Sequence, residues 1–258
     1  MAANMIYQYI KFNIKRILQY RADFVIGVVP HMIGQIANLS FFKIILGRVA
    51  SIQGWEMDEL LLLYGFSALV YGVYSLLFGN FRDLKSYLFQ GQFDIMRIRP
   101  TNLIAHIMVM SFRSEAIEQI LFGIALIAYA GARMCLEIDM IHLLAALYFV
   151  VCAVTILGGL ALLSSSFLFI TQGTFTPIGV ISELREYTKY PIDIFGSVMQ
   201  FVFSWVIPIG YVSYYPSIFL LGYPSASYFY AGFVATMSFL IGYAAFHYGL
   251  RYFNGVSA

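Results

Sequence analysis

Six long apolar runs constrain the fold of this chain more than any other feature of its sequence. They cover residues 23–46, 59–81, 103–130, 141–170, 192–214 and 225–250. A helix needs about 20 predominantly apolar residues to cross a hydrocarbon core of about 30 Å, so each run is long enough for one crossing. Of the 258 residues, 61% are hydrophobic and 11% are charged, whereas a soluble domain has roughly 25% charged residues. The sequence therefore predicts an all-α polytopic membrane protein with six transmembrane helices in one domain, residues 1–258.

The segment before the first run, residues 4–20, has the pattern of an amphipathic helix. Its polar face and its apolar face each recur at helical spacing, with Gln8, Lys11, Lys15 and Gln19 on one and Ile6, Ile10, Ile14 and Ile17 on the other. Such a helix lies in the membrane interface, with its cations near anionic head groups. The alternative is a soluble extension of the first span.

Positive charge is unequally divided between the two sides of the predicted bundle. Eleven Lys and Arg residues flank the runs on the side of the N-terminus, and three flank them on the other side. The first group is Lys11, Lys15, Arg16, Arg21, Arg82, Lys85, Arg97, Arg99, Arg185, Lys189 and Arg251, and the second is Lys43, Arg48 and Arg133. Since cytoplasmic flanks carry the excess of Lys and Arg, we expect both termini in the cytoplasm.

Three connections are long enough to hold structure. Residues 82–100 and 171–191 form the predicted cytoplasmic connections. The last outer connection, residues 208–224, is apolar and aromatic and contains three prolines. This composition predicts a re-entrant or interfacial helical hairpin whose backbone is sheltered by neighbouring spans.

The sequence lacks the common motifs of nucleotide hydrolysis, zinc binding and serine hydrolases. It contains no phosphate loop, no H-E-x-x-H zinc pair and no G-x-S-x-G context around Ser164–Ser166. Glu137, Asp139 and His142 cluster at one span end, where a solvated interfacial group is the expected explanation. With a net charge of +2, the chain has no large basic surface for nucleic acid. We expect no catalytic residue, no metal and no cofactor in this chain.

Charged and aromatic residues within the runs have two interpretations. Arg113, Glu115 and Glu118 fall in the predicted third span, where each charge costs about 2.5–3.5 kcal/mol on insertion scales. They either pair at head-group depth or line an aqueous path. Three aromatic side chains inside spans, Tyr71, Phe201 and Trp205, either pack against neighbours and lipid or contact a transported molecule. The acidic outer loops and the many tyrosines would suit a bulky cationic amphiphile.

The connection over residues 82–100 combines a cationic start with an apolar face, and Gly91 divides it into two short predicted helices. A short amphipathic helix that is joined to two spans can transmit a push from a bound soluble partner. The alternative is an interfacial helix that only anchors the loop.

These residues also carry a resemblance to a known family. Gly91-Gln-Phe-Asp94 followed by Arg99-Pro100 resembles the signature after the second span of ABC-2-type permeases, the membrane subunits of one class of ATP-binding-cassette exporters. Further similar stretches are Tyr190-Pro191-Ile192 with Phe195, Ile207-Pro208, Ser213-Tyr-Tyr-Pro216 and Gly249-Leu-Arg251-Tyr252.

The resemblance implies a permease of the bacterial cytoplasmic (inner) membrane that pairs with a second six-span permease, more often as a heterodimer than as a homodimer. It implies two cytoplasmic ATPase subunits, which bind ATP and Mg, and an amphiphilic, drug-like or lipid-like substrate. Asp94, Arg97 and Arg99 match the coupling region of that family, and the predicted contacts with the ATPase are these three with Arg82, Lys85 and Phe93. The resemblance fixes no path residue; the candidates for the path, Arg113, Glu115, Glu118, Tyr71, Phe201 and Trp205, come from the charged and aromatic residues within the runs.

Two other functional classes remain as alternatives. An ion-gradient-driven secondary transporter would use Glu115 or Glu118 as its proton or cation site, but matched helix interruptions in the two halves are absent from the sequence. A membrane enzyme would need a nucleophile and a base, and Ser164 has no obvious partner.

Overall fold

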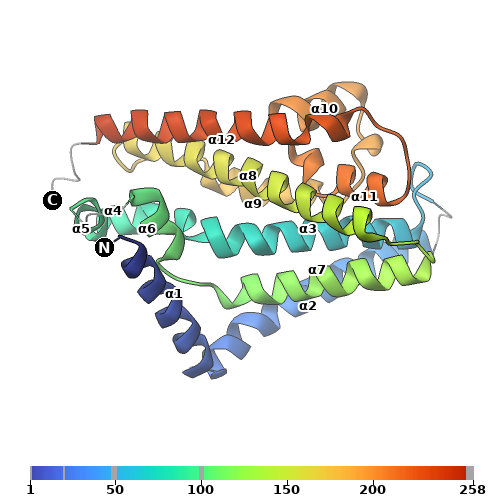
Figure 1. Ribbon diagram of the computed structural model, residues 1–258, viewed down its shortest axis with the longest axis horizontal. Coiled ribbons are helices and arrows are strands. Elements are labelled where there is room, and N and C mark those ends of the chain that lie inside the picture. Colours follow the sequence, from blue (N-terminus) through green and yellow to red (C-terminus); the bar gives the residue numbers. More distant parts are fainter. Residues whose placement is uncertain (1, 20, 48–50, 99–101, 254–258) are drawn as a thin grey trace.

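The computed structural model describes residues 2–19, 21–47, 51–98 and 102–253, and within these ranges the chain is helical, with one isolated bridge between Ile52 and Trp55. Five described helices are long and apolar enough to cross a membrane. They are α2 (Arg21–Leu46), α3 (Met57–Phe78), α7 (Ser114–Arg133), α8 (Met140–Ile170) and α12 (Ser227–Tyr252). All five extend along the long axis of the molecule (Figure 1). The prediction of an all-helical membrane protein is confirmed, with five such helices rather than six in the described part.

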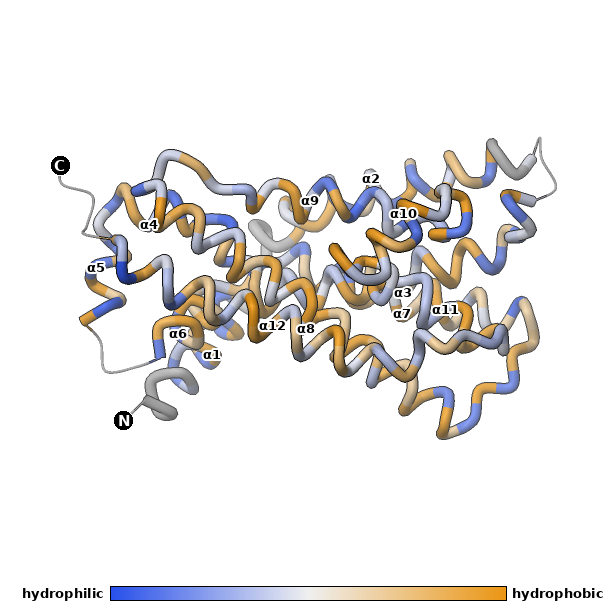
Figure 2. Tube along the Cα trace, turned by 90° about the horizontal axis from the view of Figure 1, so that it is seen from above, coloured by the Kyte–Doolittle hydropathy of each residue, from blue (hydrophilic) through white to orange (hydrophobic). Residues whose placement is uncertain are grey.

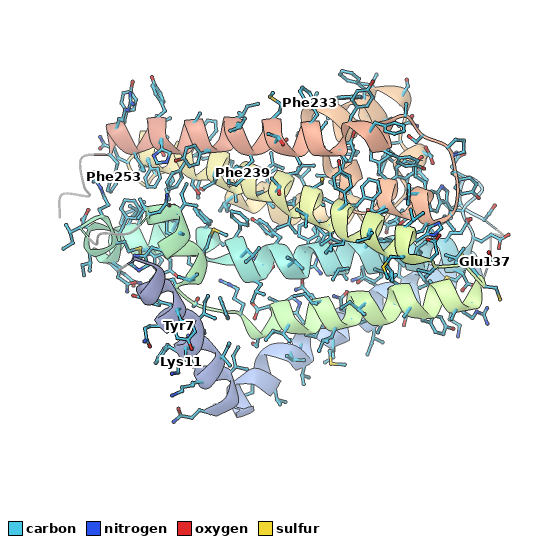
Figure 3. The ribbon with its side chains drawn as sticks, in the orientation of Figure 1. Tyr7, Lys11, Glu137, Phe233, Phe239 and Phe253 are labelled. Atoms are coloured by element: carbon cyan, nitrogen blue, oxygen red, sulfur yellow. The ribbon has the colours of Figure 1, made fainter. Side chains whose placement is uncertain are left out.

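The long helices form two closely packed pairs, α3 with α7 and α8 with α12. In the second pair, a Cβ atom at Gly242 would collide with the backbone of Gly159, and one at Gly159 would collide with the backbone of Ser238. Small residues allow backbones to approach this closely, which is the usual basis of helix association in lipid. Outward-facing side chains such as Phe233 on α12 are apolar and exposed (Figure 3).

Short helices gather at the end of the bundle where both termini lie (Figure 1). They are η1 (Gly79–Asp83), α4 (Leu84–Phe89), α5 (Gln92–Arg97) and α6 (Leu103–Val109), and the longer α1 (Ala2–Gln19) starts beside them and runs away from this end. Gly91 separates α4 from α5 with a φ of 69°, a conformation that glycine adopts at little cost. Hydrophilic residues concentrate toward the ends of the molecule, whereas α8 and α12 are mainly hydrophobic along their length (Figure 2).

The predicted third span over residues 103–130 is wrong as a single helix, because the chain breaks between α6 and α7. Asn80 donates hydrogen bonds from its amide nitrogen to the carbonyls of Ile107 (2.8 Å), Met108 (3.2 Å) and Ser111 (3.0 Å). Asn13 donates to the carbonyl of Val109 at 2.9 Å. These side chains satisfy backbone groups that the missing helical turn leaves open, which is the condition for irregular backbone in a membrane protein.

The predicted fifth span over residues 192–214 is also wrong as a continuous helix. Instead, the chain forms η2 (Ile192–Ile194), α10 (Ser197–Phe201), the π-helical turn η3 (Val202–Val206), η4 (Ile209–Tyr211) and then α11 (Tyr214–Leu220). Pro191 and Pro208 lack the N–H group that a continuous helix needs. The Ser204 hydroxyl donates to the carbonyl of Gln200 at 2.6 Å, and the Ser213 hydroxyl donates to the carbonyl of Thr188 at 2.6 Å.

The predicted cytoplasmic connection over residues 171–191 holds helix α9 (Ile178–Tyr187), which lies beside α3. The Tyr71 hydroxyl donates to the carbonyl of Ile181 (3.4 Å), and the hydroxyls of Ser67 and Thr188 lie 2.8 Å apart. Residue numbers rise along α9 as they fall along α3, so the two segments run antiparallel. The placement of Arg185 and Lys189 in a cytoplasmic flank is therefore corrected, because both lie beside the middle of α3.

Replacing Gly242 by Ala tests the close approach of α8 and α12. The added methyl meets the Gly159 backbone, which cannot move as a flexible side chain can, so we expect a loss of about 1–3 kcal/mol in stability. Thermal unfolding in detergent measures the effect. The matched control is Gly179→Ala in α9, where a Cβ meets no atom within 4 Å; equal midpoints for the two variants would contradict the packing described.

Candidate functional site

The six candidate path residues fall into three separate regions of the structure. Arg113 and Glu115 belong to the first, at the start of α7. The Arg113 guanidinium binds the Asp83 carboxylate at 2.6 Å and the Glu115 carboxylate at 3.1 Å. Asp83 ends η1, directly before α4. This arrangement favours the pairing interpretation, and it joins the turn before α4 to the first turn of α7.

The second region is a polar cluster between α2, α3, α7 and α9. The Lys189 ammonium lies 2.7 Å from both carboxylate oxygens of Glu186 and 3.4 Å from the side-chain oxygen of Asn38. Lys189 also lies 6.0 Å from the ring centroid of Tyr64, whose hydroxyl donates to Gln35 on α2. Only 5% of Lys189 is exposed, so this cation is held inside the helical bundle.

Two of the candidate path residues lie at this cluster. Tyr71 presents its ring to Arg185, whose guanidinium carbon is 5.5 Å from the ring centroid. Glu118 on α7 is 7% exposed, and its carboxylate oxygens have no hydrogen-bond partner among the described residues. The next residue, Gln119, lies 3.5 Å from the His31 ring nitrogen of α2. The cluster thus joins charged groups from α7 and α9 to polar groups on α2.

A cavity of about 350 Å³ opens between α2 and α9 at this cluster. Six of its eight lining residues are polar or charged, namely His31, Gln35, Asn38, Arg185, Glu186 and Lys189, and the other two are Pro30 and Gly34. Charged groups at this depth face water or protein, since exposure to lipid is expensive. The α2–α9 face is therefore the part of the bundle that lipid is least suited to cover.

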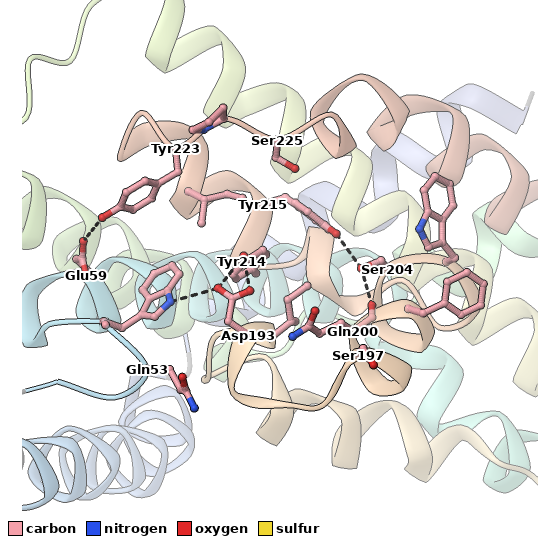
Figure 4. Close-up of a pocket in the computed structure, with 17 residues that line it drawn as sticks. Gln53, Glu59, Asp193, Ser197, Gln200, Ser204, Tyr214, Tyr215, Tyr223 and Ser225 are labelled. Atoms are coloured by element: carbon pink, nitrogen blue, oxygen red, sulfur yellow. Dashed lines mark hydrogen bonds between the residues drawn. The ribbon is translucent and has the colours of Figure 1, made fainter.

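The third region holds the last two candidate path residues, Phe201 and Trp205, in a cavity of about 610 Å³ at the opposite end from the termini (Figure 4). Asp193 lies in it and accepts hydrogen bonds from the Tyr214 hydroxyl at 2.8 Å and from the Trp55 indole at 3.4 Å. The Tyr223 hydroxyl donates to Glu59 at 3.2 Å, and the nearby Glu59 carboxylate raises the pKa of Tyr223. The residues of this region come from segments more than 100 positions apart in the chain.

Phe93, one of the predicted contacts with the ATPase, is 1% exposed and so is not free to touch a partner. Its ring centroid lies 5.2 Å from that of Phe169 at the end of α8 and 5.4 Å from that of Phe253 after α12. Phe253 is labelled at this end of the bundle in Figure 3. Phe93 therefore fixes α5 to the ends of α8 and α12, and the assignment of a direct contact is corrected to that of an anchor.

The remaining predicted contacts in this part of the chain are exposed. Arg82, Lys85, Asp94 and Arg97 all face outward on η1, α4 and α5, while Arg99 lies outside the described residues. Lys85 lies 6.0 Å from the ring of Phe89, and Arg97 lies 6.0 Å from that of Phe253. Three large apolar side chains, Phe89, Ile95 and Ile98, are 58%, 53% and 82% exposed among these charges. Here "α4–α5 surface" denotes these exposed charged and apolar residues.

The cluster of Glu137, Asp139 and His142 is explained by helix capping. The His142 backbone N–H donates to the Asp139 carboxylate at 3.0 Å, and this bond lowers the pKa of Asp139. Among the residues that the structure describes, no group of three or more His, Cys, Asp or Glu side chains could hold a metal ion.

Comparison with known proteins identifies the family. The family model for ABC-2 family transporter proteins matches residues 32–257. The chain belongs to the ABC-2 transporter family. Searches of curated proteins and of solved structures found no match.

Membership of the ABC-2 family makes this chain a membrane component of an ATP-binding-cassette transporter, and it implies association with ATPase subunits. The ion-paired start of α7, the polar cavity beside the middle of α3, the aromatic cavity and the α4–α5 surface are thus features of an ABC-2 membrane protein.

The polar cavity contains residues that sequence reasoning missed. His31, Gln35 and Asn38 recur at spacings of four and three residues within the first apolar run, and this places them on one helix face. Arg185 and Lys189 are four residues apart, which likewise predicts a shared face. These spacings indicate the two faces, but residues 171–191 are predicted to form a cytoplasmic connection.

A cysteine at position 34 tests whether water reaches the α2–α9 cavity. A Cβ at Gly34 meets no atom within 4 Å, so Gly34→Cys introduces no clash. The variant is made in a chain whose two free cysteines, Cys135 and Cys152, are replaced by serine. We expect a membrane-impermeant thiol reagent to label it at least about tenfold faster than Ile241→Cys, because thiols react in water as thiolates. Ile241 is an exposed apolar residue near the middle of α12. Equal labelling rates would contradict a hydrated cavity.

Proposed function

We propose that this chain is the permease subunit of an ATP-driven exporter and that the α4–α5 surface receives the force from cytoplasmic ATPase subunits. The observation that carries this proposal is the anchoring of α5. Phe93 is buried against Phe169 and Phe253, so a push on α5 reaches the ends of α8 and α12 through packed rings. Packed interiors transmit strain because they have low compressibility.

The chemistry of the α4–α5 surface suits a soluble partner. Exposed Phe89, Ile95 and Ile98 supply apolar anchors, and Arg82, Lys85, Asp94 and Arg97 surround them with charge. Interfaces with an apolar centre and a polar rim bind through a few buried side chains. Two ATPase subunits, which bind ATP and Mg, are the proposed partners, and Arg99 belongs to the same proposed contact.

The proposal also includes the orientation of the chain in a bacterial inner membrane, which follows from the distribution of Lys and Arg. Removing Arg185 and Lys189 from the eleven cations on the N-terminal side leaves nine, against three on the other side. This excess still favours a cytoplasmic location for both termini and for the α4–α5 surface. Helix α1 then lies at the cytoplasmic interface, where Lys11 and Lys15 are exposed.

A second six-span permease is proposed to cover the α2–α9 face. Arg185 and Glu186 on that face are partly or largely exposed at mid-depth, and another polar protein surface or a water-filled path satisfies them better than lipid does. The path for an amphiphilic, drug-like or lipid-like substrate would then run between the two permeases, of which a heterodimer is favoured. Rigid-body movement of the packed helices would open it alternately to the two sides.

The alternative function is a secondary transporter that uses Glu115 or Glu118. Glu115 is already paired with Arg113, whereas the Glu118 carboxylate lacks a hydrogen-bond partner within the described chain. Export that follows a pH gradient in the absence of ATP, and that Glu118→Gln abolishes, would favour this alternative.

Asp94→Ala combined with Arg97→Ala tests the coupling role. We expect export and substrate-stimulated ATP hydrolysis to fall at least about tenfold, since hot-spot residues each contribute about 2 kcal/mol to an interface. The measurement uses the complex that co-purifies from native membranes, reconstituted into vesicles. Helix packing should persist because both side chains are exposed.

The matched control removes one base and one acid at the other end of the molecule, Arg133→Ala with Glu137→Ala. Arg133 pairs with Asp58 at 3.4 Å on the surface, where such pairs contribute little to stability. Undiminished export by the Asp94 and Arg97 variant, or uphill transport by the isolated chain, would overturn the proposed coupling.

A further inference from the structure

The cavity at the end opposite the termini has the size of a small-molecule site. It encloses about 610 Å³ between the loop before α3, the segment from η2 to η3 and the segment from α11 to the start of α12. Ligand pockets generally range over about 300–1,000 Å³. In Figure 4, Tyr214, Tyr215 and Tyr223 approach it from one wall, and Gln200 and Ser204 approach it from another.

The residues described as lining this cavity carry negative charge that no cation among them neutralises. Its described lining holds two carboxylates, Asp193 and Glu59, and no Lys, Arg or His. Asp193 receives hydrogen bonds only from neutral donors, Tyr214 and Trp55. Glu59 accepts from the Tyr223 hydroxyl and from the Glu56 backbone, which are also neutral. Within the described residues, neither carboxylate has an ion-pair partner.

Aromatic rings surround these carboxylates. The ring centroids of Trp55 and Tyr214 lie 5.8 Å apart, and those of Tyr214 and Tyr215 lie 5.2 Å apart with an interplanar angle of 77°. Phe201 and Trp205 also line the cavity from α10 and η3, and they are 61% and 43% exposed. Aromatic faces attract cations, and Trp is the strongest of these rings.

We propose that this cavity binds an organic ammonium cation that carries an apolar body. The ammonium group lies near Asp193, where the carboxylate and the Trp55 and Tyr214 rings meet. The apolar body lies against Phe201 and Trp205. An anionic ligand would face two carboxylates, and a neutral polyol would leave both charges uncompensated, so neither fits the cavity as well.

The inference concerns the outer end of the chain and is independent of how transport is powered. The same ammonium chemistry is found in exported amphiphiles and in the head groups of zwitterionic lipids. Binding needs only this chain, so a failure here leaves the coupling proposal intact, and a failure of coupling leaves this site intact.

Tryptophan fluorescence, excited where tyrosine does not absorb, reports on this cavity. The chain has two tryptophans, and both Trp55 and Trp205 line the cavity. The full chain in neutral maltoside micelles is titrated with hexyltrimethylammonium, and hexanesulfonate serves as the probe of equal tail length and opposite charge. We expect a saturable change in tryptophan emission with the ammonium probe and none with the sulfonate.

Asp193→Asn tests the carboxylate while keeping an oxygen that accepts from Tyr214 and Trp55. We expect the dissociation constant of hexyltrimethylammonium to rise about tenfold, which corresponds to about 1.4 kcal/mol. Glu137→Gln removes one charge from the loop at the same end of the molecule, outside the cavity lining, and should change the constant by less than about twofold.

A second variant keeps the test decisive if Asp193→Asn does not fold. Glu59→Gln retains the capping box at the start of α3, because Gln serves at this position as Glu does, and it should also weaken binding severalfold. Unchanged binding in the folded variants, or equal binding of hexanesulfonate, would overturn the proposal.

Nanodiscs of two lipid compositions distinguish a lipid head group from an exported solute as the source of the ammonium cation. If a lipid head group occupies the cavity, phosphatidylcholine nanodiscs will compete with hexyltrimethylammonium, and phosphatidylglycerol nanodiscs will not. Equal binding of the probe in both lipids assigns the site to an exported solute.

Discussion

The need to satisfy every backbone N–H and C=O group away from water governs this structure. Five long helices satisfy these groups internally. The two interruptions at mid-sequence do so through side chains. Asn80 and Asn13 bind the carbonyls around the break before α7, and Ser204 and Ser213 bind carbonyls near the broken segment after α9. At the break before α7 the side chains come from distant segments, whereas after α9 Ser213 bonds to a carbonyl 25 residues away and Ser204 bonds within its own turn. Arg113 and Asp193 lie beside these two breaks.

Rigid contacts connect the two ends of the molecule. Phe93 holds α5 against Phe169 and Phe253, while Gly159 and Gly242 bring the backbones of α8 and α12 together. The α4–α5 surface, which is built on short helices, is thereby fixed to α8 and α12. This arrangement suits a membrane subunit that is moved by a partner, because a displacement at α5 is passed on through packed rings.

The two cavities differ in charge, although one polar segment links them. The α2–α9 cavity is lined by two cations, Arg185 and Lys189, and one carboxylate, Glu186. The cavity at the end opposite the termini is lined by Asp193 and Glu59 without a described cation. Asp193 follows Lys189 by four residues, so a short stretch after α9 separates a cationic lining from an anionic one. The sign of the lining charge therefore changes between the two cavities over these few residues.

Hydropathy alone determined the membrane class and the approximate bounds of α2, α3, α8 and α12, because a crossing requires a long apolar helix whatever its neighbours are. It could not place the break before α7, since the stabilising Asn80 lies about 30 positions earlier in the chain. It also assigned residues 171–191 to a cytoplasmic connection, although α9 lies beside α3. Only the tertiary structure brings Asn38, Tyr64 and Tyr71 to the charged groups of this segment and so makes a polar helix tolerable inside the bundle. Local sequence decides which segments are apolar enough to lie in lipid. The helix breaks before α7 and after α9, and the two cavities, depend on residues that only folding brings into contact.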